Sequence, residues 1–283
     1  MSLGLNKTKR RIASIKGTEK TTKAMEMIAT VKLKRFRDAF DKESVYSKEF
    51  EVLMSKLFSF DKEIISHYGR TNEGDLPTLY IVISSNLGLC GSYNSALFKY
   101  VERQMKENDV IAPIGNKAMH HFSSLGCKIS DELSSLTLSD DIGELHEACL
   151  ELKNSFNEKK YKNIVIVYTR YVNSLNFVPS SFQLLPIQLN YSKTKNDESN
   201  PPDFDESPRS MIHRLMPYYL TSMFYDRMIE SQLSEQASRR NAMQNANDNA
   251  DELLEKLTIE YNKARQNAIT QEITEVVGGA NAT

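Results

Sequence analysis

The sequence predicts two long helices, one at each end of the chain, that pair with each other and frame a small α/β domain. Three observations lead to this fold class. All eight prolines lie between Pro77 and Pro217, and residues 18–68 and 218–277 contain neither proline nor glycine. Apolar residues recur at three- and four-residue spacing in both of these windows. Between them, strand-like and helix-like segments alternate, which is typical of an α/β sheet.

The N-terminal window predicts one continuous helix over residues 1–60, because good helix formers fill it. At 1.5 Å per residue, 50 to 60 residues give a helix of about 75–90 Å, several times the usual length. A domain of ordinary size cannot cover such a helix along its whole length, so the projecting part needs a partner. Its predicted seam consists of Ile12, Ile15, Thr22, Met25, Ala29, Leu33, Phe36 and Phe40.

The C-terminal window predicts that partner, a helix over residues 210–283. Its seam consists of Ala246, Ala250, Leu253, Leu257, Tyr261, Ala264 and Ala268. Residues 1–48 hold 13 Lys/Arg and 5 Asp/Glu, whereas residues 241–283 hold 3 and 7. Opposite charge and narrow seams favour an antiparallel coiled coil, with Tyr261 and Ala264 opposite residues near Ile12 to Thr22. The alternative is two separate core helices in a bundle.

The middle of the chain predicts a small Rossmann-like α/β base domain over residues 75–190, with a mostly parallel sheet. Strands are expected at 79–85, 110–115 and 163–172, and an edge strand, in which prolines are tolerated, at 177–189. Helices are expected at 94–107, 116–126 and 143–158. Residues 192–209 are polar, mostly acidic and rich in proline, so a mobile surface loop is expected there.

The stretch SSNLGLCGSYNSALF (84–98) follows the first strand, where a doubly wound domain would bind phosphate. It contains neither GxGxxG nor a P-loop. Residues 82–97 contain no lysine, and residues 76–101 contain no acid. Its glycines are therefore interpreted as turn residues. No GxSxG elbow frames its serines, and the adjacent His120 and His121 point about 100° apart on a helix. We expect no catalytic residue, no cofactor and no metal.

Composition limits the other function classes. The net charge is −1, and no apolar run approaches the length of a transmembrane helix. Cys90, Cys127 and Cys149 are far apart and odd in number, so structural thiols in a reducing compartment are expected. The basic N-terminus could be a transit peptide or a nucleic-acid arm. However, lysine exceeds arginine there, the seam continues past Phe36, and no aromatic residue precedes Phe36.

The two ends of the chain also resemble a known family. KRRIASIKGTEKTTKAMEMIATVKLKRF (9–36) and NANDNADELLEKLTIEYNKARQNAITQEITEVVGGA (245–280) are similar to the terminal signatures of the gamma subunit of F-type ATP synthases. GLCGSYN (88–94), SFQLLPI (181–187) and LMPYYL (215–220) resemble further motifs of that family. The resemblance spans the chain in order. It implies a coiled coil of both termini with an α/β domain at its base.

The resemblance implies a non-catalytic central-stalk rotor, which couples ion translocation to ATP synthesis or hydrolysis in beta subunits. Its implied partners are the alpha and beta subunits of the hexamer, the epsilon subunit and the membrane c-ring, without nucleic acid or membrane insertion. The implied location is the cytoplasmic face of a cell membrane, bacterial rather than organellar. By resemblance, the residues that contact the hexamer are Met25, Arg239, Gln266, Thr270 and Glu272.

From the residues alone, each of these five positions would be interpreted as a seam or solvated side chain. The far end of the C-terminal helix is expected to have small, polar side chains and to make weak, replaceable contacts. Its representative residues are Ala268, Thr270, Gln271, Thr274 and Ala280.

The chain departs from the family pattern at several positions. These are Asn86 and Leu87, where Asp and a basic residue are usual, Arg240 for Met, Thr21 for Ile, and Thr169–Arg170 for Asn–Lys. An alternative is therefore a gamma-like rotor of a paralogous ATPase that drives another process. A nucleotide-dependent α/β enzyme and a nucleic-acid-binding coiled-coil scaffold are the alternatives from other classes.

Overall fold

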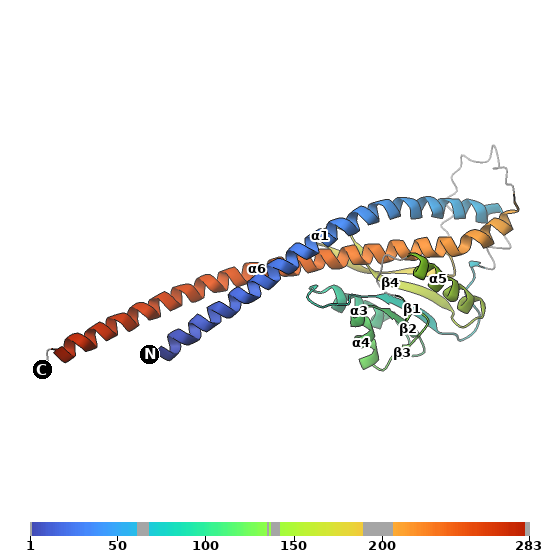
Figure 1. The fold of residues 1–283 in the computed structure, drawn as a ribbon. Helices are drawn as coiled ribbons and strands as arrows, with labels where there is room; N and C mark the ends of the chain where they lie inside the picture. The colour runs from blue at the N-terminus through green and yellow to red at the C-terminus, as the bar shows by residue number, and fades with distance from the viewer. Residues whose placement is uncertain (1, 61–67, 135, 137–141, 189–205, 281–283) are drawn as a thin grey trace. The chain divides into compact units, whose positions relative to one another are not determined.

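The computed structural model describes residues 2–60, 68–134, 136, 142–188 and 206–280 (Figure 1). Two long helices, α1 (Ser2–Phe60) and α6 (Pro208–Ala280), contain 59 and 73 residues. By contacts, the chain divides into residues 32–238 and a second unit of residues 1–31 with 239–283. Each long helix belongs to both units. Of the predicted polar loop 192–209, residues 192–205 lie outside the described residues.

The unit of residues 32–238 contains a five-stranded sheet in the order β3-β2-β1-β4-β5. The strands are β1 (Thr78–Ile83), β2 (Val110–Ile114), β3 (Lys128–Ile129), β4 (Asn163–Tyr171) and β5 (Phe177–Leu185). β1 pairs in parallel with β2 and β4, β3 pairs in parallel with β2, and β5 pairs antiparallel with β4. The predicted, mostly parallel sheet is confirmed. The prediction missed β3, which at two residues is too short for a periodic pattern.

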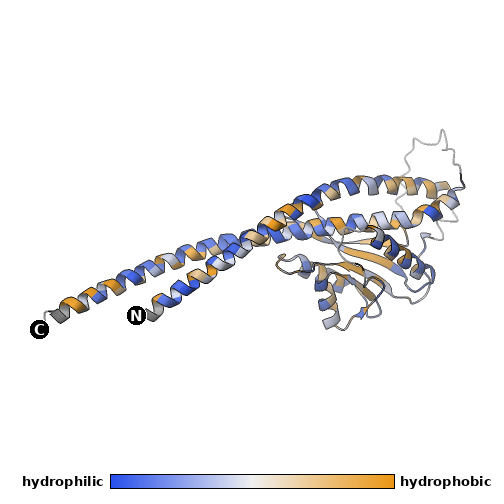
Figure 2. Ribbon diagram, viewed as in Figure 1, coloured by the Kyte–Doolittle hydropathy of each residue, from blue (hydrophilic) through white to orange (hydrophobic). Residues whose placement is uncertain are grey.

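Helices cover both faces of this sheet, because its strands alternate buried apolar residues to either side. One face packs on α3 (Tyr93–Gln104) and α4 (Asn116–Ser124) through a cluster that includes Val82, Leu97 and Phe122. The other packs on α5 (Ile142–Asn157) and on parts of α1 and α6 through a larger cluster. Figure 2 shows the apolar strands between these helices. The predicted helices are confirmed within a few residues at their ends.

Within this unit, α6 begins on the sheet face that also carries α5. Pro217 lies inside the helix and has no backbone N–H to donate. The Thr221 hydroxyl donates to the Pro217 carbonyl at 2.8 Å, and His146 of α5 lies 3.1 Å from the same hydroxyl. From Met228 to Ser238 every residue of α6 is buried, including several polar side chains.

The other unit consists of two antiparallel helical segments, residues 2–31 of α1 and 239–280 of α6 (Figure 1). The two chain ends lie at the same end of this pair. The predicted antiparallel coiled coil is therefore confirmed, and the alternative of two separate core helices does not describe this unit.

Candidate partner-contact surface

The two helices of this unit meet along a heptad seam. On α1 the covered positions are Ile12, Ile15, Glu19, Thr22, Glu26 and Ala29, at alternating spacings of three and four. On α6 they are Met243, Asn247, Ala250, Leu254, Leu257 and Tyr261. This 3.5-residue repeat is the pattern of a coiled coil. Leu253, which the sequence placed in the seam, is exposed, because Leu254 holds the heptad position instead. Ala264 continues the heptad but is exposed.

A polar layer interrupts this seam. The Asn247 amide, only 5 % exposed, donates to Glu26 Oε2 at 2.6 Å, and the Thr22 hydroxyl bonds to Asn247 Oδ1. Beside it, Lys23 pairs with Glu19 of its own helix and lies 4.0 Å from Asp251. A buried asparagine in a seam specifies register, because another alignment leaves it without partners.

This register corrects part of the predicted pairing. Thr22 lies opposite Asn247 and not opposite Tyr261. Both helices rise equally per residue, so Tyr261 lies level with about residues 8–13. Of the predicted range Ile12 to Thr22, the part near Ile12 therefore lies level with Tyr261, and the part near Thr22 does not.

The structure does not bring the five predicted contact residues together in one site. Met25 and Arg239 are half-buried, whereas Gln266, Thr270 and Glu272 are exposed. Gln266 and Thr270 are four residues apart and share a face of α6, and the Thr270 hydroxyl donates to the Gln266 carbonyl at 3.0 Å. Glu272 follows two residues later and therefore points to a different face. These positions fit a surface that surrounds a shaft rather than a pocket.

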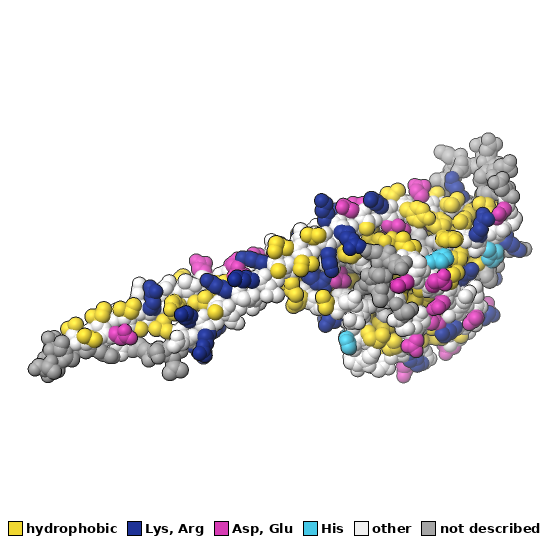
Figure 3. All heavy atoms as spheres, in the orientation of Figure 1, with side chains coloured by type: hydrophobic (Ala, Val, Ile, Leu, Met, Phe, Trp, Pro, Cys, Tyr) yellow, Lys and Arg dark blue, Asp and Glu magenta, His cyan; other side chains and the backbone are white. Residues whose placement is uncertain are grey.

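The tip of α6 is less polar than expected from the sequence. Its exposed side chains include Ile269 (47 %), Ile273 (59 %), Val276 (72 %) and Val277 (54 %). Figure 3 shows hydrophobic side chains on the visible face near the chain ends. The expectation of a small, polar tip was wrong because it counted the threonines and alanines and overlooked this ridge. The three- and four-residue spacing from Ile269 to Val276 was the signal that could have revealed it.

The loop between β1 and α3, residues 84–92, is a tightly bonded turn. Leu89 and Gly91 have φ angles of 61° and 58°. The Ser85 hydroxyl donates to the Leu87 carbonyl at 2.7 Å, and the Asn94 amide donates to Ser85 Oγ at 2.7 Å. These bonds use the side chains that a phosphate would need, which favours the interpretation of the loop as a turn.

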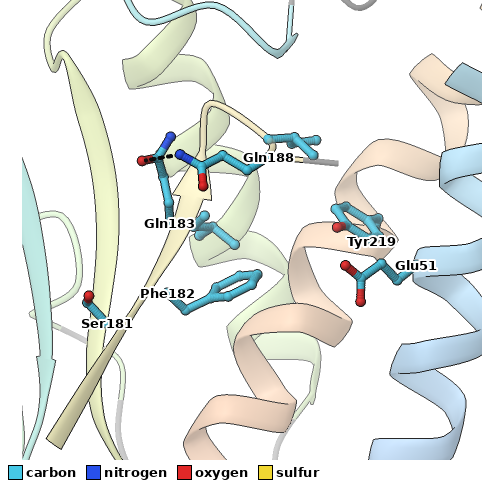
Figure 4. A pocket seen from close by; sticks show the side chains of 8 residues that line it. Glu51, Ser181, Phe182, Gln183, Gln188 and Tyr219 are labelled. Atoms are coloured by element: carbon cyan, nitrogen blue, oxygen red, sulfur yellow. Dashed lines mark hydrogen bonds between the residues drawn. The ribbon is translucent and has the colours of Figure 1, made fainter. Parts of the chain in front are cut away.

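One hollow of about 230 Å³ lies among β5, α1 and α6 (Figure 4). Its lining includes Glu51, Phe182 and Tyr219, and the Gln188 amide donates to Gln183 Oε1 at 3.1 Å. Burial, and then the Glu51 carboxylate, raise the pKa of the Tyr219 hydroxyl, so this phenol stays neutral. The polar side chains of the lining are two amides, one carboxylate, one phenol and the Ser181 hydroxyl, with no paired acid and base, so the hollow suggests no chemistry.

The described residues also bear on metals and membranes. Among them, no three His, Cys, Asp or Glu side chains are grouped so that they could hold a metal ion. No described helix combines the length and hydropathy that a membrane span requires. Cys90 and Cys149 are buried, Cys127 is half-buried, and all three are free thiols.

Comparison with known proteins adds a family. Residues 4–283 match the family model described as ATP synthase. The chain is 38 % identical over 281 residues to the ATP synthase gamma chain of Mycoplasmopsis pulmonis, covering 98 % of each chain. It is 33 % identical over 287 residues to the gamma chain of Heliobacterium modesticaldum, covering 99 % of each.

Solved structures agree in fold. The chain matches one from the Euglena gracilis mitochondrial ATP synthase OSCP/F1/c-ring complex with a TM-score of 0.69 and 18 % identity, covering 100 % of this chain and 95 % of that one. It matches one from the central stalk and c-ring of Tetrahymena thermophila mitochondrial ATP synthase with a TM-score of 0.60 and 20 % identity, covering 80 % and 99 %. At these identities the likeness shows the fold.

Proposed function

The chain belongs to the family of ATP synthase gamma chains and is the central-stalk rotor subunit of an F-type ATP synthase, and from this premise we propose how its structure serves rotation. The observation that carries the proposal is the two-helix unit of residues 2–31 and 239–280, whose surface differs from face to face. We propose that this unit turns inside a hexamer of alternating alpha and beta subunits.

Asymmetry of this shaft is the proposed basis of coupling. Its α1 face carries basic residues such as Lys9, Arg10 and Lys16, whereas α6 contributes Asp251, Glu255 and other acids. Each beta subunit then meets a different set of charges at a given angle. Nucleotide affinity therefore differs among the three sites, and rotation exchanges those affinities.

The proposed contacts with the hexamer are Met25, Arg239, Gln266, Thr270 and Glu272. The exposed tip residues Ile269, Ile273, Val276 and Val277 extend this surface, and their apolar side chains favour a smooth apolar lining in the hexamer. A lining without directional partners resists withdrawal of the shaft but not its rotation, because burial of apolar area has no preferred angle.

The chain itself is a non-catalytic stalk subunit. We propose that catalysis resides in the beta subunits, since the loop after β1 contains no lysine or acid that could act on a nucleotide. We place the complex at a bacterial cell membrane, as the bacterial relatives suggest, with this chain on the cytoplasmic side. The base then meets the epsilon subunit and the c-ring.

The test is purification of the chain from native membranes under mild detergent. Alpha, beta, epsilon and c subunits are expected in the complex, whereas the isolated chain is expected to show no ATP turnover. Turnover that co-migrates with the pure chain, or a complex without alpha- and beta-like subunits, would contradict the proposal. Unfamiliar extra subunits would instead support the paralogous rotary ATPase, which the arginine at position 240 leaves open.

A further inference from the structure

The α/β sheet contains a crevice at its carboxyl edge. β1 and β4 are parallel neighbours whose last paired residues are Val82 and Val167. After β1 the chain crosses to β2 on one side, and after β4 it turns to β5 on the other. Such a reversal of strand order opens a crevice between the two strand ends. In doubly wound sheets this is where nucleotides and other ligands bind.

In this chain α6 occupies that crevice. Beyond its pairing with β1, β4 continues through Thr169 and Tyr171. The Thr169 amide donates to Ser231 Oγ at 3.2 Å, and the Tyr171 amide donates to Glu230 Oε1 at 3.1 Å. Two consecutive side chains of α6 therefore accept the hydrogen bonds of the strand end.

Further bonds tie the same stretch of α6 to α3 and to the loop after β1. The Tyr93 hydroxyl lies 2.8 Å from Ser231 Oγ and 3.5 Å from the carbonyl of Ile83, the last residue of β1. About two turns further along α6, the Ser238 hydroxyl donates to the Cys90 carbonyl at 2.7 Å. The loop that would bind phosphate in a nucleotide domain thus binds α6.

Small residues of α6 are fully enclosed at this place. Ser231 and Ser234 are 0 % exposed and Ala237 is 1 % exposed. Small side chains let a helix backbone approach the strand ends closely, where larger ones would hold it away. Burial also removes competing water, so each hydrogen bond holds the helix more firmly than it would at the surface.

We propose that this crevice is the seat through which turning force passes between the α/β base and α6, with Glu230, Ser231 and Ser238 as positioning residues. The inference rests on the proposed rotor function. Apolar contacts have no preferred angle, whereas hydrogen bonds are directional. The bonded face therefore resists rotation of α6 about its own axis. Ser238 is the last residue of the 32–238 unit, so the seat lies where α6 leaves it.

The test compares matched serine variants of the full chain in the assembled complex. The pair Ser231→Ala and Ser238→Ala removes the seat's hydroxyls. Ser222→Ala is the control, because Ser222 is also buried on α6 but donates to Glu43 of α1 at 3.0 Å. Assembly of the wild-type chain with alpha and beta subunits is checked first, and its failure to assemble would count against the proposed function and not against the seat.

Two readouts follow. Amide hydrogen exchange of Thr169 is expected to accelerate about tenfold or more in the double variant and to stay unchanged in Ser222→Ala, since only the double variant loses the acceptor for the Thr169 amide. Angular fluctuation of a bead attached to the base, with the shaft held by the hexamer, is expected to widen in the double variant alone. Equal widening in both variants, or unchanged exchange and fluctuation in the double variant, overturns the proposal.

A third arm uses the wild-type chain. Because α6 fills the crevice, MgATP and MgADP at millimolar concentration are expected to leave its melting temperature unchanged. A rise in melting temperature, abolished by a bulky substitution at Ser92 in the loop after β1, would show that the crevice is free for a nucleotide and would overturn the proposal.

Discussion

Arg239 and Arg240 are consecutive residues of α6 that cannot serve one surface, because neighbours differ by about 100° around a helix. Both are half-buried. We expect Arg239→Ala to weaken coupling in the assembled complex while leaving the helix intact. The loss is expected to be about 0.2–1 kcal/mol per contact, which is the usual value of an exposed ion pair. The ratio of ATP-driven ion transport to ATP hydrolysis measures this.

Arg240→Met is the companion variant. The Arg240 Nε atom is buried and has no acceptor among the described residues, so methionine removes an unsatisfied donor. The free energy of unfolding of the chain, obtained from thermal unfolding, is expected to be unchanged or raised by up to about 1 kcal/mol. Equal, small effects of both changes on coupling would mean that the face assigned to the hexamer is the wrong one.

Glu43 of α1 gives a pH dependence at the same scale. Burial raises the pKa of its carboxyl, although the Ser222 hydroxyl donates to it. The folded state therefore holds this proton more tightly than the unfolded state does, and stability falls as the pH rises from about 4.5 through the raised pKa. Glu43→Gln keeps an acceptor for Ser222 and has no charge to bury.

We therefore expect Glu43→Gln to be more stable than the wild type at pH 7, by less than about 1 kcal/mol because solvent reaches the side chain, and equally stable near pH 4. Chemical denaturation at the two pH values measures this. Glu49→Gln, at an exposed position on the same helix, is the control. A gain for Glu43→Gln that is the same at both pH values would exclude titration as its cause.

At the scale of elements, the positions of proline and glycine and the spacing of apolar residues were sufficient to predict the helices and most strands. They could not fix the register of the coiled coil, because Glu26 and Asn247 are polar and were left out of the predicted apolar seams. Nor could they show that α6 fills the sheet crevice, because its serines there look like ordinary helix-surface residues in sequence. The five hexamer contacts depend on a partner surface that the chain does not contain, so they remain predictions.

The polar layer is expected to hold the register of the coiled coil, and removing the layer tests this. Asn247→Ala removes both interhelical hydrogen bonds of the layer, and we expect about 1–2 kcal/mol of local destabilisation with register slippage. Cysteines at 23 and 251 are expected to cross-link within one chain through a short thiol reagent. With Asn247→Ala, the off-register pair at 23 and 254 is expected to cross-link as well.

The control for that experiment is Asn249→Ala, an exposed position on the same helix. It should leave the cross-linking pattern as in the wild type. Cross-links that form solely between chains would contradict the hairpin, and an unchanged pattern in Asn247→Ala would show that apolar residues alone set the register.

At the scale of the whole molecule, stability is expected to be unevenly distributed between the two units. Both hydrophobic clusters lie entirely within residues 32–238. Among the described residues of the two-helix unit, the buried apolar side chains are Ala29, Met243 and Leu257, with half-buried neighbours along the seam. At about 25 cal/mol per Å² of apolar area, a narrow seam stabilises its helices far less than a two-sided core stabilises a sheet.

We therefore predict that the free chain opens in two steps. Amides of residues 5–28 and 246–274 should exchange at low urea while those of β1, β2 and β4 stay protected, because local opening follows local burial. In the assembled complex the hexamer should enclose the shaft and slow this exchange, whereas exchange in the sheet should hardly change. Hydrogen exchange followed by mass spectrometry distinguishes the segments. A single transition with equal protection throughout would contradict this prediction. It would show that, even without the hexamer, the two-helix unit is as stable as the unit that holds the sheet. The asymmetric surface would then be a rigid feature of the free chain.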